Sequence, residues 1–135
     1  MSGLADKRNF YINGKWVAPA VPRDLEVIDP STEDAVAVIS LGDQADTDAA
    51  VAAARAAFPA WSATPPATRL AHVEKILEIY KRRAPDMARA ISAEMGAPQD
   101  MSLADQVGVG QHHIETFIDA FRDFVDATQI PTVLT

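Results

Sequence analysis

The sequence predicts a mixed α and β fold, in which a short part rich in β-strands precedes about four helices. Two observations carry this prediction. Hydrophobic residues alternate with a period of two as far as Leu41, and from Asp46 onward they recur with a period near 3.6. An Asn-Gly pair also lies between two apolar runs near the start. We therefore expect a hairpin and strands in residues 1–45 and a helical segment in residues 46–135.

The composition limits the function classes. The chain has 135 residues, no cysteine and a net charge of −7. This length suits a single domain. The absence of cysteine excludes a disulfide framework, Cys-ligated metal sites and attack by a thiolate of these residues. The acidic balance disfavours nucleic acid as a partner, and no apolar run is long enough to predict a membrane span. We expect a cytoplasmic protein, because the N-terminus lacks the apolar core of a signal peptide.

The predicted strands lie between turn signals. Asn13-Gly14 separates residues 10–12 from residues 16–17 and predicts a tight hairpin, since both turn residues accept a positive φ. Two further antiparallel strands are predicted at residues 25–28 and 35–41, on either side of the turn signature Asp29-Pro30-Ser31-Thr32.

Caps and prolines delimit the first predicted helices. Thr47 is expected to cap a helix whose apolar side includes Val51 and Phe58 and which ends at Pro59. A second helix is expected to open near Pro66 and to stop or restart at Pro85. Its basic run, Lys81-Arg82-Arg83, would then lie near a helix end, where positive charges interact favourably with the helix dipole.

A third helical segment is expected to end at Gly96, and a last helix to span residues 103–127. The strands are too few to cover the apolar surface of all these helices, so the chain is predicted to be one incomplete structural unit. The last helix is predicted to bury a stripe made by Val107, Ile114, Phe117, Ile118, Phe121 and Val125.

The residues offer little independent chemistry. Gly108-Val109-Gly110 is not a dinucleotide-binding loop, because no strand precedes it and His113 stands at the position of the third glycine. We expect these glycines to be close-contact positions in a helix. His112 and Glu115 supply at most two metal ligands, which is too few. No catalytic and no cofactor-binding residue is predicted in these 135 residues.

Four stretches carry a family resemblance. They read FYINGKWV at residues 10–17, VIDPST at 27–32, AVAAARAAFPAW at 50–61 and EMGAP at 94–98. Together, in this order, they resemble the N-terminal portion of the NAD(P)-dependent aldehyde dehydrogenase superfamily. Arg69 falls where an arginine commonly follows in that family. The resemblance implies an α/β fold in which the helical segment packs on a dinucleotide-binding domain that is absent from this sequence.

The resemblance also implies an activity. In the family a cysteine thiolate attacks an aldehyde, a hydride passes to NAD or NADP, and water releases a carboxylic acid. The nucleophile, the base and the dinucleotide crossover belong to later parts of the family's chains, so this stretch alone is predicted to be inactive. The implied partners are an aldehyde substrate and the remainder of the chain, and the complete protein is expected to be a homodimer or homotetramer. The alternative is a truncated, non-catalytic binding or scaffold protein that associates with another chain.

Two sets of site residues are implied by the resemblance. Family members often hold a monovalent cation, Na or K, which would take the Glu94 carboxylate and the backbone carbonyls of Val27 and Ile28. The counterpart of the last helix forms one wall of the family's aldehyde tunnel, which Asp105 and Val109 would face.

This sequence departs from the family pattern at two positions. Glu33 stands where the family usually has glycine. If this turn position needs a positive φ, the glutamate backbone would be strained there. Ala97 replaces the usual lysine of the Glu-x-Gly-Lys-Pro turn.

Overall fold

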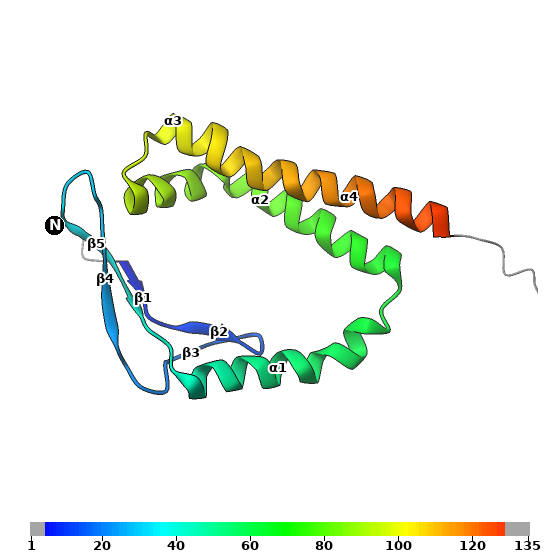
Figure 1. Ribbon diagram of the computed structural model, residues 1–135, viewed down its shortest axis with the longest axis horizontal. Helices are drawn as coiled ribbons and strands as arrows, with labels where there is room; N and C mark the ends of the chain where they lie inside the picture. Colours follow the sequence, from blue (N-terminus) through cyan, green and yellow to red (C-terminus); the bar gives the residue numbers. More distant parts are fainter. Residues whose placement is uncertain (1–4, 129–135) are drawn as a thin grey trace, which may run out of the picture. The chain divides into compact units, whose positions relative to one another are not determined.

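A computed structural model describes residues 5–128 and groups the chain into two compact units. The first unit combines Met1–Ala63 with Ser92–Gly96, and the second combines Thr64–Ile91 with Ala97–Thr135. The strands belong to the first unit, whereas the second contains α4 and all of α2 except its last four residues, Ser92–Met95 (Figure 1).

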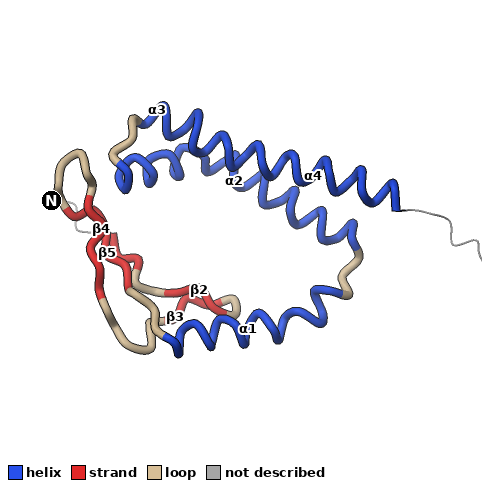
Figure 2. Tube along the Cα trace, viewed as in Figure 1, coloured by secondary structure: helices blue, strands red, loops and turns tan. Residues whose placement is uncertain are grey.

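The first unit contains a three-stranded sheet (Figure 2). Its strands are β1 (Ala5–Lys7), β5 (Ala35–Ser40) and β4 (Asp24–Ile28), in that spatial order. The antiparallel pairing of β4 with β5 confirms the two predicted strands, and a bulge lies between Val27 and Ile28. Strand β1 was not predicted, because three residues that include an aspartate and a lysine give no apolar alternation. It pairs with β5 in parallel.

The predicted hairpin is confirmed. It joins β2 (Phe10–Ile12) to β3 (Lys15–Val17). Asn13 has a φ of 51° and Gly14 a φ of 74°, the left-handed conformation that a two-residue hairpin turn requires.

Helix α1 (Gln44–Ser62) begins earlier and ends later than its predicted bounds. The N-cap is Asp43 and not Thr47. The Asp43 side chain accepts hydrogen bonds from the N–H groups of Ala45 and Asp46, and the Asp46 side chain accepts one from the N–H of Asp43, which completes a capping box. Pro59 lies inside the helix, whose last turn is closed by the Ser62 hydroxyl donating to the Pro59 carbonyl at 3.0 Å.

Helix α2 (Pro66–Met95) runs without a break through Pro85, so the predicted stop or restart at that residue is wrong. The basic run at residues 81–83 therefore lies in the middle of a helix, and its predicted role at a helix end is also wrong. Two of its three residues form ion pairs instead, Lys81 with Glu115 and Arg83 with Asp86.

The last predicted helix is composite. It consists of α3 (Gln99–Met101), a π-helix η1 (Ser102–Val107) and α4 (Gly108–Thr128). Val107 and Ile118 are buried as predicted, while Ile114 and Phe121 are half-buried. Phe117 is 52% exposed, so its place in the buried stripe is wrong, and the side chain of Val125 lies outside the described part of the chain.

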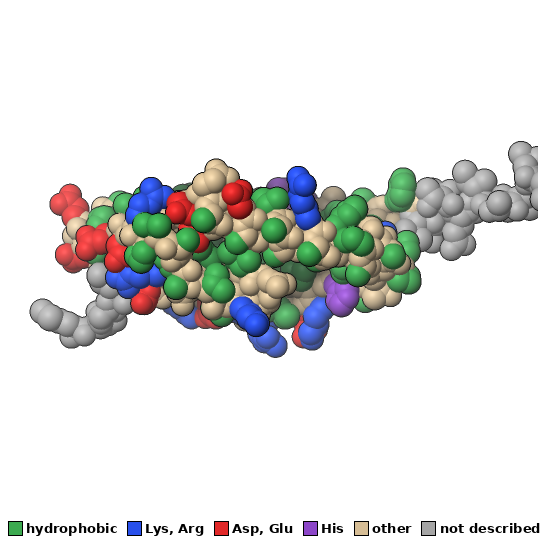
Figure 3. All heavy atoms as spheres, turned by 90° about the horizontal axis from the view of Figure 1, so that it is seen from below, with side chains coloured by type: hydrophobic (Ala, Val, Ile, Leu, Met, Phe, Trp, Pro, Cys, Tyr) green, Lys and Arg blue, Asp and Glu red, His purple; other side chains and the backbone are tan. Residues whose placement is uncertain are grey.

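Many large apolar side chains are at the surface. The face drawn in Figure 3 shows hydrophobic side chains between scattered charged ones. On α1 the predicted apolar side is exposed, at 46% for Val51 and 64% for Phe58, because no described residue covers it. Among residues 5–128, no helix combines the length and the apolar character that crossing a bilayer demands.

Candidate functional site

The residues implied for a cation site lie on neighbouring segments of the first unit. Glu94 is in the last turn of α2 and is exposed. Gly96 ends this helix with a φ of 68°, and its N–H donates to the Ser92 carbonyl at 2.9 Å, as the predicted cap requires. A Cβ on Gly96 would lie 2.9 Å from Cγ of Pro30, so the end of α2 packs against the turn that follows Ile28.

That turn is held by Asp29. Its carboxylate accepts hydrogen bonds from the hydroxyl and the N–H of Ser31, at 2.6 and 2.8 Å, and these bonds lower the pKa of Asp29. Glu33 completes the turn with a φ of 63°, which confirms the predicted backbone strain. The bulge at Val27/Ile28 interrupts the strand ladder at the two residues whose carbonyls the resemblance implicates.

The residue types implied for this site offer oxygen donors and no histidine or cysteine. Within residues 5–128, no group of three or more His, Asp or Glu side chains converges as a metal site. One carboxylate with backbone carbonyls is a set of oxygen donors, which hard cations prefer. The chemistry of these donors is compatible with the ion that the resemblance implies.

Asp105 and Val109, the residues implied for the aldehyde tunnel, belong to the second unit. Both are exposed, Val109 by 53%, and they lie on either side of Val107, which is 1% exposed. Val107 is thus part of the core of this unit, whereas Asp105 and Val109 are available to line another surface.

Sequence reasoning missed the contact that holds this segment. The hydroxyl of Tyr80 on α2 donates to the backbone carbonyl of Val107 at 2.9 Å. A Cβ on Gly110 would lie 2.3 Å from the same hydroxyl oxygen. The prediction of a close-contact position in a helix is confirmed for Gly110, whose partner is Tyr80, and is wrong for Gly108, where the nearest atom to a Cβ would be the Leu103 oxygen at 3.9 Å. A glycine inside an apolar helix pattern was the available signal.

Ion pairs join α2 to α4 beside this contact. Lys81 Nζ lies 2.6 Å from Glu115 Oε1, and Arg122 lies 2.6 Å from Glu74. The hydrogen bond from Lys81 lowers the pKa of Glu115. His112 and His113 are exposed on the same helix, and their rings do not share a ligand cluster among the residues described.

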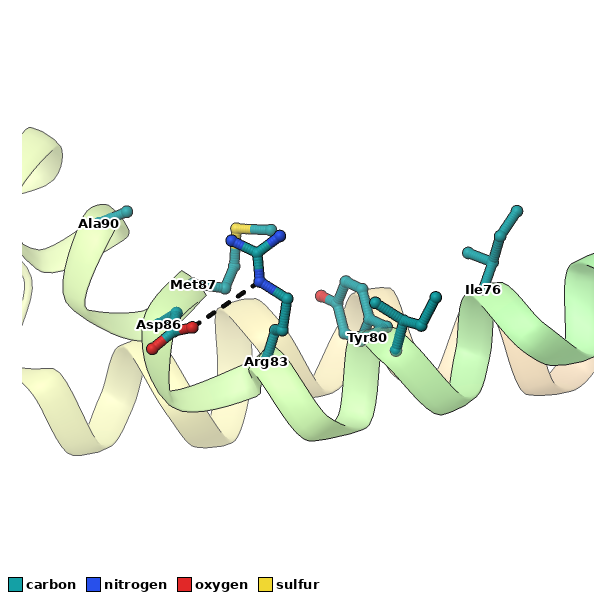
Figure 4. A pocket seen from close by; sticks show the side chains of 7 residues that line it. Ile76, Tyr80, Arg83, Asp86, Met87 and Ala90 are labelled. Carbon is teal, nitrogen blue, oxygen red and sulfur yellow. Dashed lines mark ion pairs between the residues drawn. The ribbon is translucent and has the colours of Figure 1, made fainter. Parts of the chain in front are cut away.

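A hollow of about 340 Å³ runs along one face of α2 (Figure 4). Its wall is mainly apolar, and Arg83 and Asp86 pair across 3.7 Å at its edge. It contains no nucleophile paired with a base. The lining residues are Ile76, Ile79, Tyr80, Arg83, Asp86, Met87 and Ala90.

Comparison with known proteins identifies the class. Residues 16–134 match the model of the aldehyde dehydrogenase family. The chain belongs to the aldehyde dehydrogenase family, and its α/β fold and N-terminal position agree with the resemblance seen in the sequence.

Individual members of the family are similar to this chain in sequence or in structure. The chain is 41% identical over 122 residues to 3-succinoylsemialdehyde-pyridine dehydrogenase from Pseudomonas sp, which covers 90% of this chain and 26% of the relative. An aldehyde dehydrogenase structure from Bartonella henselae shares 56% identity, with a TM-score of 0.88 over 89% of this chain and 25% of that one. Aldehyde dehydrogenase C from Pseudomonas syringae, a Cys-to-Ala mutant solved with NAD+ and octanal, shares 42% identity. Its TM-score is 0.83, over 85% of this chain and 24% of that one. The chain therefore spans about a quarter of the length of these proteins.

Proposed function

We propose that this chain is the N-terminal region of an NAD(P)-dependent aldehyde dehydrogenase that oxidises an aldehyde to a carboxylic acid. The observation that carries the proposal is the family match over residues 16–134 of a chain that spans about a quarter of its relatives. Because these residues contain no cysteine, the attacking thiol must come from outside them. The Pseudomonas syringae relative, captured with NAD+ and octanal, supports this choice of cofactor and substrate class.

The proposed reaction has two stages. A cysteine thiolate adds to the aldehyde carbonyl, and the resulting tetrahedral adduct loses a hydride to form a thioester. Water then hydrolyses the thioester, which releases the acid and restores the thiol. The bound nicotinamide supplies the hydride acceptor, and no residue of this chain is assigned to hold it.

This chain supplies supporting parts of the site. Asp105 and Val109, which are exposed on one segment of the second unit, are proposed to line the path of the aldehyde. Glu94 and the carbonyls of Val27 and Ile28 are proposed to hold a Na or K ion that steadies the junction between α2 and the sheet. The complete protein is proposed to be a cytoplasmic homodimer or homotetramer.

Activity of the full translated protein tests the proposal. Octanal and a short aldehyde are offered with NAD or NADP, and the reduced nicotinamide is followed by its absorbance. We expect turnover by the full protein and none by residues 1–135 alone. Iodoacetamide should abolish turnover, and mass spectrometry should locate the label outside these residues. Turnover that survives complete alkylation would contradict the thiol mechanism.

The cation site has its own experiment. Crystals of the full protein soaked in rubidium chloride should give an anomalous peak beside Glu94. The variant Glu94→Gln should lose the peak, whereas Glu26→Gln, an exposed glutamate on β4, should keep it. A native crystal without the peak would overturn the assignment.

The second candidate is a non-catalytic chain that associates with another protein. The observation that favours it is the exposure of large apolar side chains, including 71% for Trp16 and 67% for Phe124. The intact mass of the native polypeptide separates the two candidates. A mass that ends at Thr135, without a second chain that supplies a thiol, would support the scaffold and exclude the enzyme.

A further inference from the structure

The π-helix η1, which follows α3, exposes a different set of side chains than a regular α-helix would. Ser102 and Val107 are almost fully buried, at 0% and 1% exposure, and they are five residues apart. An α-helix of 3.6 residues per turn buries positions three or four apart. Here four consecutive residues, 103–106, are exposed between the two buried ones. The π-turn has therefore added one residue to the outward arc, and Asp105 lies in that arc.

Tyr80 fixes the end of this turn. Its hydroxyl donates to the carbonyl of Val107, the last residue of η1, across 27 positions of sequence. The hydroxyl fits there because Gly110 has no Cβ, which would lie 2.3 Å from the oxygen. Figure 4 shows the Tyr80 ring beside the hollow on α2. One side chain from α2 thus holds both the π-turn and the first turn of α4.

Single π-turns within α-helices are uncommon and often occur at functional sites. We propose that Tyr80 is a positioning residue for the aldehyde: its hydroxyl holds the π-turn that carries Asp105 and the first turn of α4 that carries Val109, and so presents both residues to the substrate path. This inference rests on the proposed function. It assigns selectivity between aldehydes to a tyrosine that does not itself touch the substrate.

The variant Tyr80→Phe tests the inference in the full protein. It removes one hydroxyl and keeps the ring. We expect the ratio of kcat/KM for octanal to that for acetaldehyde to change by about two- to tenfold, the range that the net free energy of one hydrogen bond allows. The change should appear mainly in KM. Hydrogen exchange should become faster in residues 102–110 and stay unchanged in the hairpin.

The other tyrosine provides a matched control. Tyr11 is 63% exposed on β2, and Tyr11→Phe should leave both the ratio and the exchange pattern unchanged. A uniform fall of kcat for every aldehyde in Tyr80→Phe, with an unchanged ratio, would show a merely structural role and overturn the inference.

Deletion of Ala104 tests the π-turn without touching Tyr80. It brings Ser102 and Val107 to a spacing of four, which a regular α-helix can bury, so folding should survive. We expect the aldehyde ratio to change at least as much as in Tyr80→Phe. An unchanged ratio in this variant would overturn the inference while aldehyde oxidation itself persists. A native protein that oxidises no aldehyde would instead overturn the proposed function.

Discussion

The carboxylate of Asp46 accepts a hydrogen bond of 2.9 Å from the backbone N–H of Ala20, which lies 26 residues earlier in the chain. Its other oxygen accepts from the N–H of Asp43 at 3.1 Å. One side chain therefore closes the capping box of α1 and ties the loop after the hairpin to the start of that helix.

These two bonds predict a pH dependence. Bonding by the N–H of Ala20, and next by that of Asp43, lowers the pKa of Asp46 below its ordinary value of 3.8. A lowered folded-state pKa means that the carboxylate stabilises the fold above the unfolded value, and that this contribution is lost as the pH falls through the folded one. Asp46→Asn, which keeps only one acceptor, should lower Tm near neutral pH. The difference from the native protein should shrink as the pH falls through that lowered pKa.

Asp48→Asn is the matched control for this titration. Asp48 lies on the same helix, and its carboxylate accepts a hydrogen bond of 2.7 Å from the side-chain amide of Gln44, one turn earlier. Its Tm should stay close to native at every pH. A Tm loss in Asp46→Asn that does not vary with pH would contradict the role given to its charge.

Gly96→Ala should destabilise the protein more than Gly14→Ala. Both glycines have a positive φ, 68° and 74°, so each alanine takes on a left-handed strain of about 1–2 kcal/mol. Only Gly96 also faces an atom, Cγ of Pro30, at 2.9 Å, whereas nothing lies within 4 Å at Gly14. We expect a total loss of about 2–4 kcal/mol at Gly96, since overpacking adds to the strain. The midpoints of urea unfolding show which of the two variants is less stable. Equal losses in the free energy of unfolding would contradict the close contact between Gly96 and Pro30.

Glu33→Gly should stabilise the protein. Glu33 is held at a φ of 63°, and glycine adopts this conformation without strain. The relief, reduced by the greater freedom of glycine in the unfolded chain, should leave a gain of about 0.5–1 kcal/mol. Glu26→Gly on β4, where no positive φ occurs, should instead lose about 0.5–1 kcal/mol. Thermal unfolding compares the two, and a Tm decrease in Glu33→Gly would refute the strain.

Gly110→Ala and Tyr80→Phe should be coupled. The alanine Cβ would meet the Tyr80 oxygen at 2.3 Å, an overlap that should cost about 1–3 kcal/mol. Removing the hydroxyl should recover part of this loss, because the nearest remaining ring atom would be 3.0 Å away. A double-mutant cycle on unfolding free energies should therefore show an interaction above about 0.5 kcal/mol.

Gly108→Ala is the control for that cycle. The nearest atom to its Cβ would be the Leu103 oxygen at 3.9 Å, an ordinary contact. Because alanine is the better helix former, this variant should be neutral or slightly more stable, with no coupling to Tyr80→Phe. If the losses in unfolding free energy of Gly110→Ala and Tyr80→Phe were strictly additive, the close approach of the Tyr80 hydroxyl to Gly110 would be excluded.

The family and the conformations of the local turns could be predicted from the sequence. Asn13-Gly14 and Gly96 were assigned their backbone conformation from their own residue types, and Glu33 from the family resemblance, and each has that conformation in the structure. Such positions depend on the φ preferences of single residues and on neighbours within a few positions, so a linear pattern is enough to predict them. The cation and tunnel residues came from the family resemblance, and they stay predictions.

Only the tertiary structure decided where helices continue and where they change pitch. Pro85 has the local signature of a helix end, yet α2 continues through it and buries Ala88 to 1% exposure one turn later. The last residue of η1, Val107, accepts a hydrogen bond from Tyr80, 27 residues earlier in the chain. A proline or an inserted residue costs a helix a hydrogen bond locally, and packing against a distant segment offsets that cost. The sequence by itself determined the family and the turns, whereas contacts between α2 and α4 decided the path of the helix that carries Asp105 and Val109.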